Sequence, residues 1–155
     1  MRICYLTNSA IPSTSANSIA TVKICEAFTE LKNEVILITR NVKNNNKDIF
    51  KFYDVKFKFN IIRILRFKKF PIGINYYLFS FLAFWKAKKI SEMIITRNYF
   101  VVFLCSLFKK KCVIELHGDI SNESRIVKLI FGIFKTLNSK SISKIVCISK
   151  SIKMK

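Results

Sequence analysis

The sequence predicts an α/β fold, in which helices cover both faces of a doubly wound, mostly parallel sheet. Two observations lead to this prediction. Short apolar runs alternate along the chain with stretches of helical periodicity, and the first forty residues follow the order strand, loop, helix, strand. A helix that connects two buried strands makes those strands parallel. At 155 residues the chain has the length of one domain with its own core, and we expect residues 1–155 to form that domain.

The first βαβ unit lies between Arg2 and Asn41. Apolar runs at Arg2–Thr7 and Val35–Thr39 predict two buried strands, separated by a polar loop and a helix. Apolar residues recur at helical spacing between the strands, at Ala20, Ile24, Ala27, Phe28 and Leu31. The candidates for the helix cap are Ser15, Asn17 and Ser18. Asn33 is expected to take the left-handed conformation that ends such a helix.

The rest of the chain continues the alternation. Strands are predicted at Val55–Phe59, where apolar and polar residues alternate, and at Met93–Thr96, Cys112–Leu116 and Ile145–Ile148. Helices are predicted at Asn75–Lys89, Tyr99–Lys109 and Ser124–Asn138, and a further one begins at Ser149.

The net charge of +19 is the most unusual property of the composition. A positive field attracts nucleic acid, anionic lipids or phosphorylated substrates, although a solvated lysine-rich surface explains the charge equally well. Ten basic residues and one acidic residue lie between Lys51 and Lys89, interleaved with aromatics. Because basic and aromatic residues together are typical of proteins that bind anionic membranes, we expect membrane contacts in this region. The candidates are Arg63, Arg66, Lys68 and Lys69.

The cysteines and the apolar segments indicate a cytoplasmic protein. Five widely spaced cysteines and a single histidine make neither a disulfide framework nor a metal site. The amino terminus does not have the pattern of a signal peptide. The longest nearly apolar run, Ile74–Trp85, has about twelve residues, whereas a membrane-spanning helix needs roughly twenty. The expected location is therefore the cytoplasm, peripherally on the inner face of the plasma membrane.

Ligands of open α/β sheets bind beyond the carboxyl ends of the strands. The residues that follow the predicted strands are Asn8, Ser9, Arg97, Asn98, His117, Gly118 and Ser149. His117 either binds a sugar hydroxyl or phosphate oxygen or is a half-buried histidine bonded to backbone. Arg97 either binds a phosphate or carboxylate or forms an interior ion pair with Glu115 or Glu92. Glu115, inside an apolar strand, is either a substrate-binding residue or structurally paired, and it is expected on the same face as His117.

Motifs for dinucleotide binding, a P-loop and a nucleophile elbow are missing. Three patches instead resemble glycosyltransferase family 4. The opening MRICYLT, with the loop and helix that end in LKNEV (31–35), resembles the start of these proteins. The segments IITRN (94–98) and VIELHG (113–118) resemble their middle, and IVCISKS (145–151) resembles a strand near the end of their first domain.

The resemblance implies a GT-B architecture, in which two Rossmann-like domains enclose the active cleft. This chain corresponds to the amino-terminal domain, which binds a lipid-linked or polysaccharide acceptor, and lacks the carboxyl-terminal domain that binds a nucleotide-sugar donor. By the same resemblance His117 is catalytic and contacts the donor sugar, while Arg97 and Ser149 line the cleft. The loop from Asn8 to Ser18, with Asn8, Ser9 and Ser15, lies against the acceptor and the donor phosphate. No metal or other cofactor is implied.

Three functions remain open. The first is the acceptor-binding part of a glycosyltransferase, docked on an anionic membrane and inactive until a donor domain is supplied, for instance by a separate chain. The second is a non-catalytic remnant or interaction module that keeps only the fold. The third, ranked last, is a basic nucleic-acid-binding module.

Overall fold

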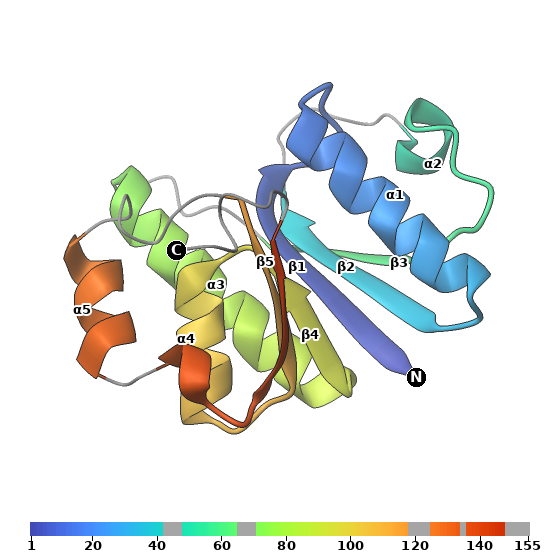
Figure 1. The fold of residues 1–155 in the computed structure, drawn as a ribbon. Coiled ribbons are helices and arrows are strands. Elements are labelled where there is room, and N and C mark those ends of the chain that lie inside the picture. The colour runs from blue at the N-terminus through green and yellow to red at the C-terminus, as the bar shows by residue number, and fades with distance from the viewer. Residues whose placement is uncertain (42–47, 65–70, 118–124, 134–135, 148–155) are drawn as a thin grey trace.

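A six-stranded sheet forms the centre of the protein in the computed structural model, which describes residues 1–41, 48–64, 71–117, 125–133 and 136–147. The strands are β1 (Arg2–Ala10), β2 (Glu34–Arg40), β3 (Asn60–Ile64), β4 (Met93–Thr96), β5 (Cys112–Leu116) and β6 (Ile142–Cys147). They lie in the order β3-β2-β1-β4-β5-β6, and every neighbouring pair is parallel (Figure 1). This order confirms the predicted α/β fold.

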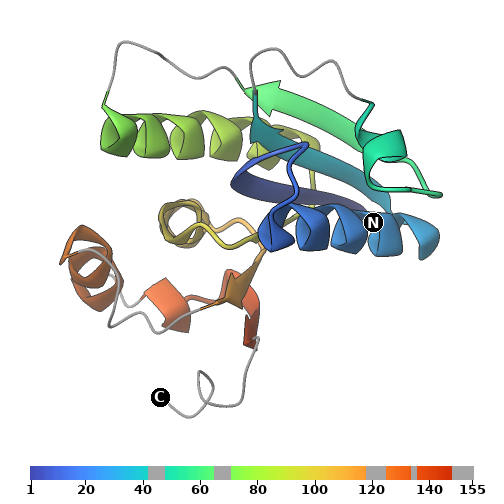
Figure 2. The same cartoon turned by 90° about the horizontal axis from the view of Figure 1, so that it is seen from above.

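Helices cover both faces of the sheet, as predicted. They are α1 (Ala16–Glu30), α2 (Ile49–Phe52), α3 (Ile72–Ile90), α4 (Tyr99–Leu107) and α5 (Arg125–Ile133), with a short 3₁₀ helix, η2, at Thr136–Asn138. The helices α1 and α2 lie on one side of the sheet, and α3, α4 and α5 lie on the other (Figures 1 and 2). The sheet is therefore doubly wound.

The core consists of two apolar layers, because alternate residues of each strand point to opposite faces. In β1, Ile3 and Tyr5 pack against α1, whereas Cys4 and Leu6 pack beneath α3 and α4. Four of the five cysteines are buried as free thiols, and Cys147 is half-buried. Among the described helices, none is long and apolar enough to cross a membrane.

The ends of α1 are determined by local hydrogen bonds. The Ser15 hydroxyl accepts from the Ser18 N–H at 3.3 Å and caps the helix, so one of the three cap candidates is correct. The left-handed residue at the other end is Lys32 (φ 61°), and the expectation for Asn33 is wrong by one residue. The Asn33 amide instead donates to the Phe28 carbonyl at 3.1 Å, so it satisfies the helix end through its side chain.

The predicted strand at Val55–Phe59 is wrong, since the third strand begins at Asn60. Val55 N donates to the Phe50 carbonyl, and Lys56 N donates to Glu26 of α1 at 2.5 Å. These bonds tie the segment to α2 and α1 instead of to a strand. Val55 and Phe59 are nevertheless buried, so the alternation in the sequence reflects burial rather than a β-ladder.

Other boundaries shift by a few residues. Strand β1 continues past Thr7 to Ala10, and β6 begins earlier than predicted, at Ile142. Helix α3 begins directly after Pro71, whose own backbone angles (φ −54°, ψ 156°) lie outside the helical region. The short α2 was not predicted. The predicted helix from Ser149 lies outside the described residues.

Candidate functional site

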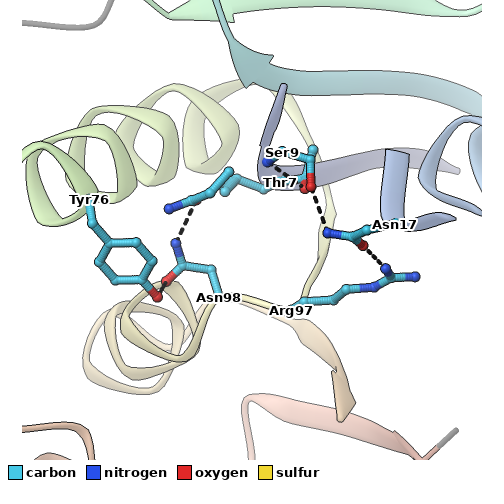
Figure 3. A pocket seen from close by; sticks show the side chains of 8 residues that line it. Thr7, Ser9, Asn17, Tyr76, Arg97 and Asn98 are labelled. Carbon is cyan, nitrogen blue, oxygen red and sulfur yellow. Dashed lines mark hydrogen bonds between the residues drawn. The ribbon is translucent and has the colours of Figure 1, made fainter. Parts of the chain in front are cut away.

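The strand order reverses between β1 and β4, which lie side by side at the centre of the sheet. The connections from these strands lead in opposite directions, and this leaves a crevice at their carboxyl ends. A cleft with a cavity volume of about 290 Å³ occupies this place (Figure 3). It is lined by Leu6, Thr7, Asn8, Ser9, Asn17, Tyr76, Arg97 and Asn98.

Hydroxyl groups of the neighbouring strands hold the carboxyl end of β1. The Thr96 hydroxyl donates to the Leu6 carbonyl at 2.9 Å, and the Thr39 hydroxyl donates to the Ser9 carbonyl at 2.7 Å. Both threonines are buried. The two bonds hold the carbonyl groups of Leu6 and Ser9 where the register of β1 with β2 shifts, between Leu6 and Ala10.

Asn98 is the centre of what we term the amide cluster, formed by Asn8, Tyr76, Ser80 and Asn98. It caps α4, since its Oδ1 accepts from the Val101 N–H at 3.1 Å, and the same oxygen accepts from the Tyr76 hydroxyl at 2.9 Å. Its Nδ2 donates to Asn8 Oδ1 at 2.8 Å and to Ser80 Oγ at 2.6 Å. Asn98 is 5% exposed, and both polar atoms of its side-chain amide are fully used in these hydrogen bonds.

A charged cluster, formed by Tyr5, Arg97, Glu115 and His117, lies beside the amide cluster. Arg97 Nε lies 2.7 Å from Glu115 Oε2, and the Tyr5 hydroxyl donates to the same oxygen at 3.0 Å. Burial raises the pKa of the Tyr5 phenol, and the negative charge of Glu115 raises it further. Of the two alternatives for Arg97, the ion pair with Glu115 is present, so the positive charge in the cleft is balanced.

Asn17 connects the charged cluster to the loop after β1. Arg97 Nη1 donates to Asn17 Oδ1, and Asn17 Nδ2 donates to the Ser9 hydroxyl oxygen at 2.6 Å. Figure 3 shows this bridge on one side of the cleft and Tyr76 on the other. The first turn of α1 thus closes one wall.

The structure brings together four of the predicted site residues, because Asn8, Ser9, Arg97 and Asn98 all line the cleft. Glu115 lies behind Arg97 as its ion-pair partner. Ser15 is the cap of α1 and does not line the cleft. The remaining predictions, Gly118, Ser149, Arg66, Lys68 and Lys69, lie outside the described residues.

His117 follows the end of β5 and is 41% exposed. Its Nε2 lies 3.7 Å from Glu115 Oε2, as expected for residues on one face of a strand, but it does not line the cleft. Arg63 is exposed on β3, between Ile62 and Ile64, which pack on the α3 side of the sheet. Strand alternation therefore directs Arg63 to the opposite side.

Sequence reasoning missed Thr7 and Tyr76 as site residues, and it named Asn17 only as a cap candidate and as part of the loop from Asn8 to Ser18. The rule that ligands bind beyond strand ends does not find Tyr76, because this residue lies in the first turns of a helix. Within the described ranges, no three His, Cys, Asp or Glu side chains are placed to hold a metal ion. The polar lining is mainly amides and hydroxyls, which are groups that hydrogen-bond an uncharged polar ligand.

These features define a class of protein: a doubly wound, parallel α/β sheet with a polar cleft at the point where the strand order reverses. The fold is shared with the solved structure of a glycosyltransferase from Rickettsia africae ESF-5, with a TM-score of 0.60 and 19% sequence identity. The match covers 99% of this chain and 38% of the Rickettsia chain, so this chain spans less than half the length of that protein. No protein-family model and no curated protein matches the sequence.

Proposed function

We propose that this chain is the acceptor-binding, amino-terminal part of a family 4 glycosyltransferase. The sugar comes from a nucleotide-sugar donor and goes to a lipid-linked or polysaccharide acceptor. Transfer requires a donor-binding domain, encoded with this chain or supplied by a separate one. The observation that supports the proposal best is the cleft at the carboxyl ends of β1 and β4, in a fold shared with the Rickettsia glycosyltransferase.

The chemistry of the cleft supports a saccharide ligand. Side-chain amides and hydroxyls that are held by other side chains can exchange hydrogen bonds with several sugar hydroxyls at once. Arg97 is already paired with Glu115, so it contributes a donor without an unbalanced charge. In this proposal Asn8, Ser9 and Arg97 bind the acceptor in the cleft that Asn98 also lines, while His117 contacts the donor sugar.

Binding of saccharides to the chain tests this function. We expect methyl glycosides of common hexoses to shift the backbone amide resonances of Asn8, Asn98 and their neighbours in ¹⁵N NMR spectra. A matched control region is the shallow pocket at the opposite end of the sheet, which contains Asn60 and Ile61 and should not respond. If no saccharide changes the resonances of the cleft, the proposal fails and a remnant that keeps only the fold replaces it.

An anionic membrane surface is part of the proposal, and α3 supplies the docking face. Its exposed apolar residues are Ile72, Ile74, Phe81 and Leu82. Lys86, Lys88 and Lys89 follow near its carboxyl end, and Lys88 Nζ lies 4.8 Å from the centre of the Trp85 ring. Apolar side chains next to lysines are the combination that binds the interface of an anionic bilayer. Arg63 is on the other side of the sheet and does not contribute to this face.

Sedimentation with lipid vesicles tests the docking face. We expect the protein to bind phosphatidylglycerol vesicles and to leave phosphatidylcholine vesicles unbound. The double substitution Phe81→Ser and Leu82→Ser should weaken binding by about tenfold or more, because it removes two apolar side chains from the interface. Leu31→Ser is the control, since Leu31 is exposed at the far end of α1. Equal loss in the control would place the contact elsewhere.

A further inference from the structure

The side-chain amide of Asn8 has an unused hydrogen-bond donor at the wall of the cleft. Its Oδ1 accepts from Asn98, but its Nδ2 is buried and has no partner among the described atoms. A buried N–H without a partner destabilises a folded protein, so native structures almost always supply an acceptor. Asn8 also lines the cleft, where a ligand can provide this acceptor.

The orientation of the Asn8 amide follows from its neighbours. The Val101 N–H is a backbone donor, so the atom of Asn98 that faces it is an oxygen and the other atom is the nitrogen. Ser80 is consistent with this, because its hydroxyl donates to the Tyr76 carbonyl at 2.6 Å and its oxygen is left to accept. Asn98 Nδ2 therefore donates to both Ser80 and Asn8. The atom of Asn8 that accepts is an oxygen, and its nitrogen is left as the unpaired atom.

From this geometry we infer that Asn8 is a specificity-determining residue, whose Nδ2 donates a hydrogen bond to an oxygen of an uncharged saccharide in the cleft. The inference rests on the proposed function and deepens it. An uncharged ligand is favoured because Arg97 is the one cation among the described residues that line the cleft, and its charge is balanced by Glu115. A hydroxyl or carbonyl oxygen matches a single neutral N–H donor.

The Ser9 hydroxyl is the neighbouring group that can complete this contact. Its oxygen accepts from Asn17 Nδ2 at 2.6 Å, which leaves its proton to be donated. Asn8 and Ser9 are consecutive residues at the end of β1, and both line the cleft. Both donors are therefore available to oxygen atoms of a ligand in the cleft. Each amide or hydroxyl is held by another side chain, so little ordering is needed when the ligand binds.

The test follows the side-chain NH₂ resonances of Asn8 in the ¹⁵N-labelled protein. The ligands are methyl glucoside, methyl galactoside, methyl mannoside and N-acetylglucosamine, with inorganic phosphate as a charged comparison. We expect at least one saccharide to shift the Asn8 NH₂ pair, and phosphate to leave it unchanged. Asn8→Asp keeps the oxygen that faces Asn98 and removes the donor, so it should weaken binding of that saccharide by at least about tenfold. Asn60→Asp is the control and should bind normally.

The outcomes separate this inference from the proposed function. A saccharide that shifts Asn98 and its neighbours but leaves the Asn8 NH₂ pair unchanged overturns the role of Asn8 and leaves the proposed function standing. A response to phosphate alone also overturns it. If no saccharide shifts any resonance of the cleft, the proposed function itself fails. The NH₂ measurement uses the unmodified protein, so it decides the question even if Asn8→Asp does not fold.

Discussion

The amide cluster and the charged cluster lie next to each other at the carboxyl ends of β4 and β5, but they are held in different ways. In the amide cluster, neutral groups bond Asn98 to the first turn of α4, to α3 and to the end of β1. In the charged cluster, one carboxylate oxygen of Glu115 accepts from Arg97 and Tyr5. The first is a network of directional bonds between three elements, and the second is centred on a single charge.

The difference shows which cluster supports the fold and which adjusts the electrostatics of the cleft. Removing a buried neutral group leaves several partners unpaired, and each of them costs free energy. Removing one member of an ion pair near the surface is milder, because the remaining charge is partly hydrated. Substitutions in the amide cluster should therefore cost more stability than those in the charged cluster, and only the charged cluster should depend on pH.

The largest effect is expected for Asn98→Ala, which should lower the free energy of unfolding by about 4 kcal/mol. The substitution removes the cap of α4 and leaves Asn8, Ser80 and Tyr76 without a shared partner. Urea denaturation followed by circular dichroism measures the change. A loss below about 1 kcal/mol would mean that the network contributes little beyond a surface cap.

Glu115→Ala should lower the free energy of unfolding by about 2 kcal/mol, because Arg97 and Tyr5 lose the oxygen that both of them use. Arg97 is 16% and Glu115 11% exposed, so hydration reduces the cost below that of a fully buried pair. A double-mutant cycle with Arg97→Ala isolates the interaction of the pair. The exposed pair of Arg2 and Glu34 is the control and should show no measurable coupling. If the coupling energy between Arg97 and Glu115 were as large as the loss expected for Asn98→Ala, the two clusters would not differ in how much they stabilise the fold.

Tyr5→Phe should cost about 1.5 kcal/mol near neutral pH, the value of a hydrogen bond to a charged group. Its effect should also change with pH. The pKa of the Tyr5 phenol is raised in the folded protein, so the stability linked to its proton is present below the unfolded pKa of about 10 and is lost as the pH rises above it. The difference between wild type and variant should therefore shrink above pH 10, by up to about 1.4 kcal/mol per pH unit. A constant difference from pH 7 to 11 would contradict the raised pKa.

The smallest effect on stability is expected for His117→Ala, within about 0.5 kcal/mol of wild type, since the imidazole is exposed and 3.7 Å from its nearest charged partner. With a donor domain supplied, the same substitution should abolish sugar transfer if His117 is catalytic. Thermal unfolding and a transfer assay measure the two quantities. Normal transfer would remove His117 from the catalytic residues, whereas a large loss of stability would make it a structural residue.

The sequence was sufficient for the fold class because βαβ alternation leaves few topologies, and the observed parallel order is one of them. It was also sufficient for residues that directly follow strands, such as Asn98 after β4. It did not predict β3. The alternating burial of Val55 and Phe59 has the sequence pattern of a strand, whereas the actual strand begins at Asn60. The error arises because tertiary contacts determine this segment. The hydrogen bonds that hold Val55–Phe59 lead to α1 and α2, and the local sequence pattern does not encode them.

Tyr76 was missed for a related reason. Its place in the cleft depends on the angle at which α3 crosses the sheet, and packing of the whole helix determines that angle. The unpaired nitrogen of Asn8 could not be predicted from the sequence either, because it is assigned through hydrogen bonds that run from Val101 to Asn98 and from Asn98 to Asn8. Strand-end rules identify positions, whereas donors and acceptors are assigned only by three-dimensional neighbours.

Helix α3 carries residues of the cleft and residues of the proposed membrane face on the same few turns. Tyr76 lines the cleft, while the exposed Ile74 and Phe81 lie about 3 Å and 7.5 Å from it along the helix axis, at 1.5 Å per residue. A bilayer that contacts these side chains is therefore separated from the cleft by little more than the thickness of one helix, about 10 Å. If the proposed function holds, an acceptor anchored in that bilayer needs only a short headgroup to reach Asn8, and α3 is the spacer that sets its minimum length.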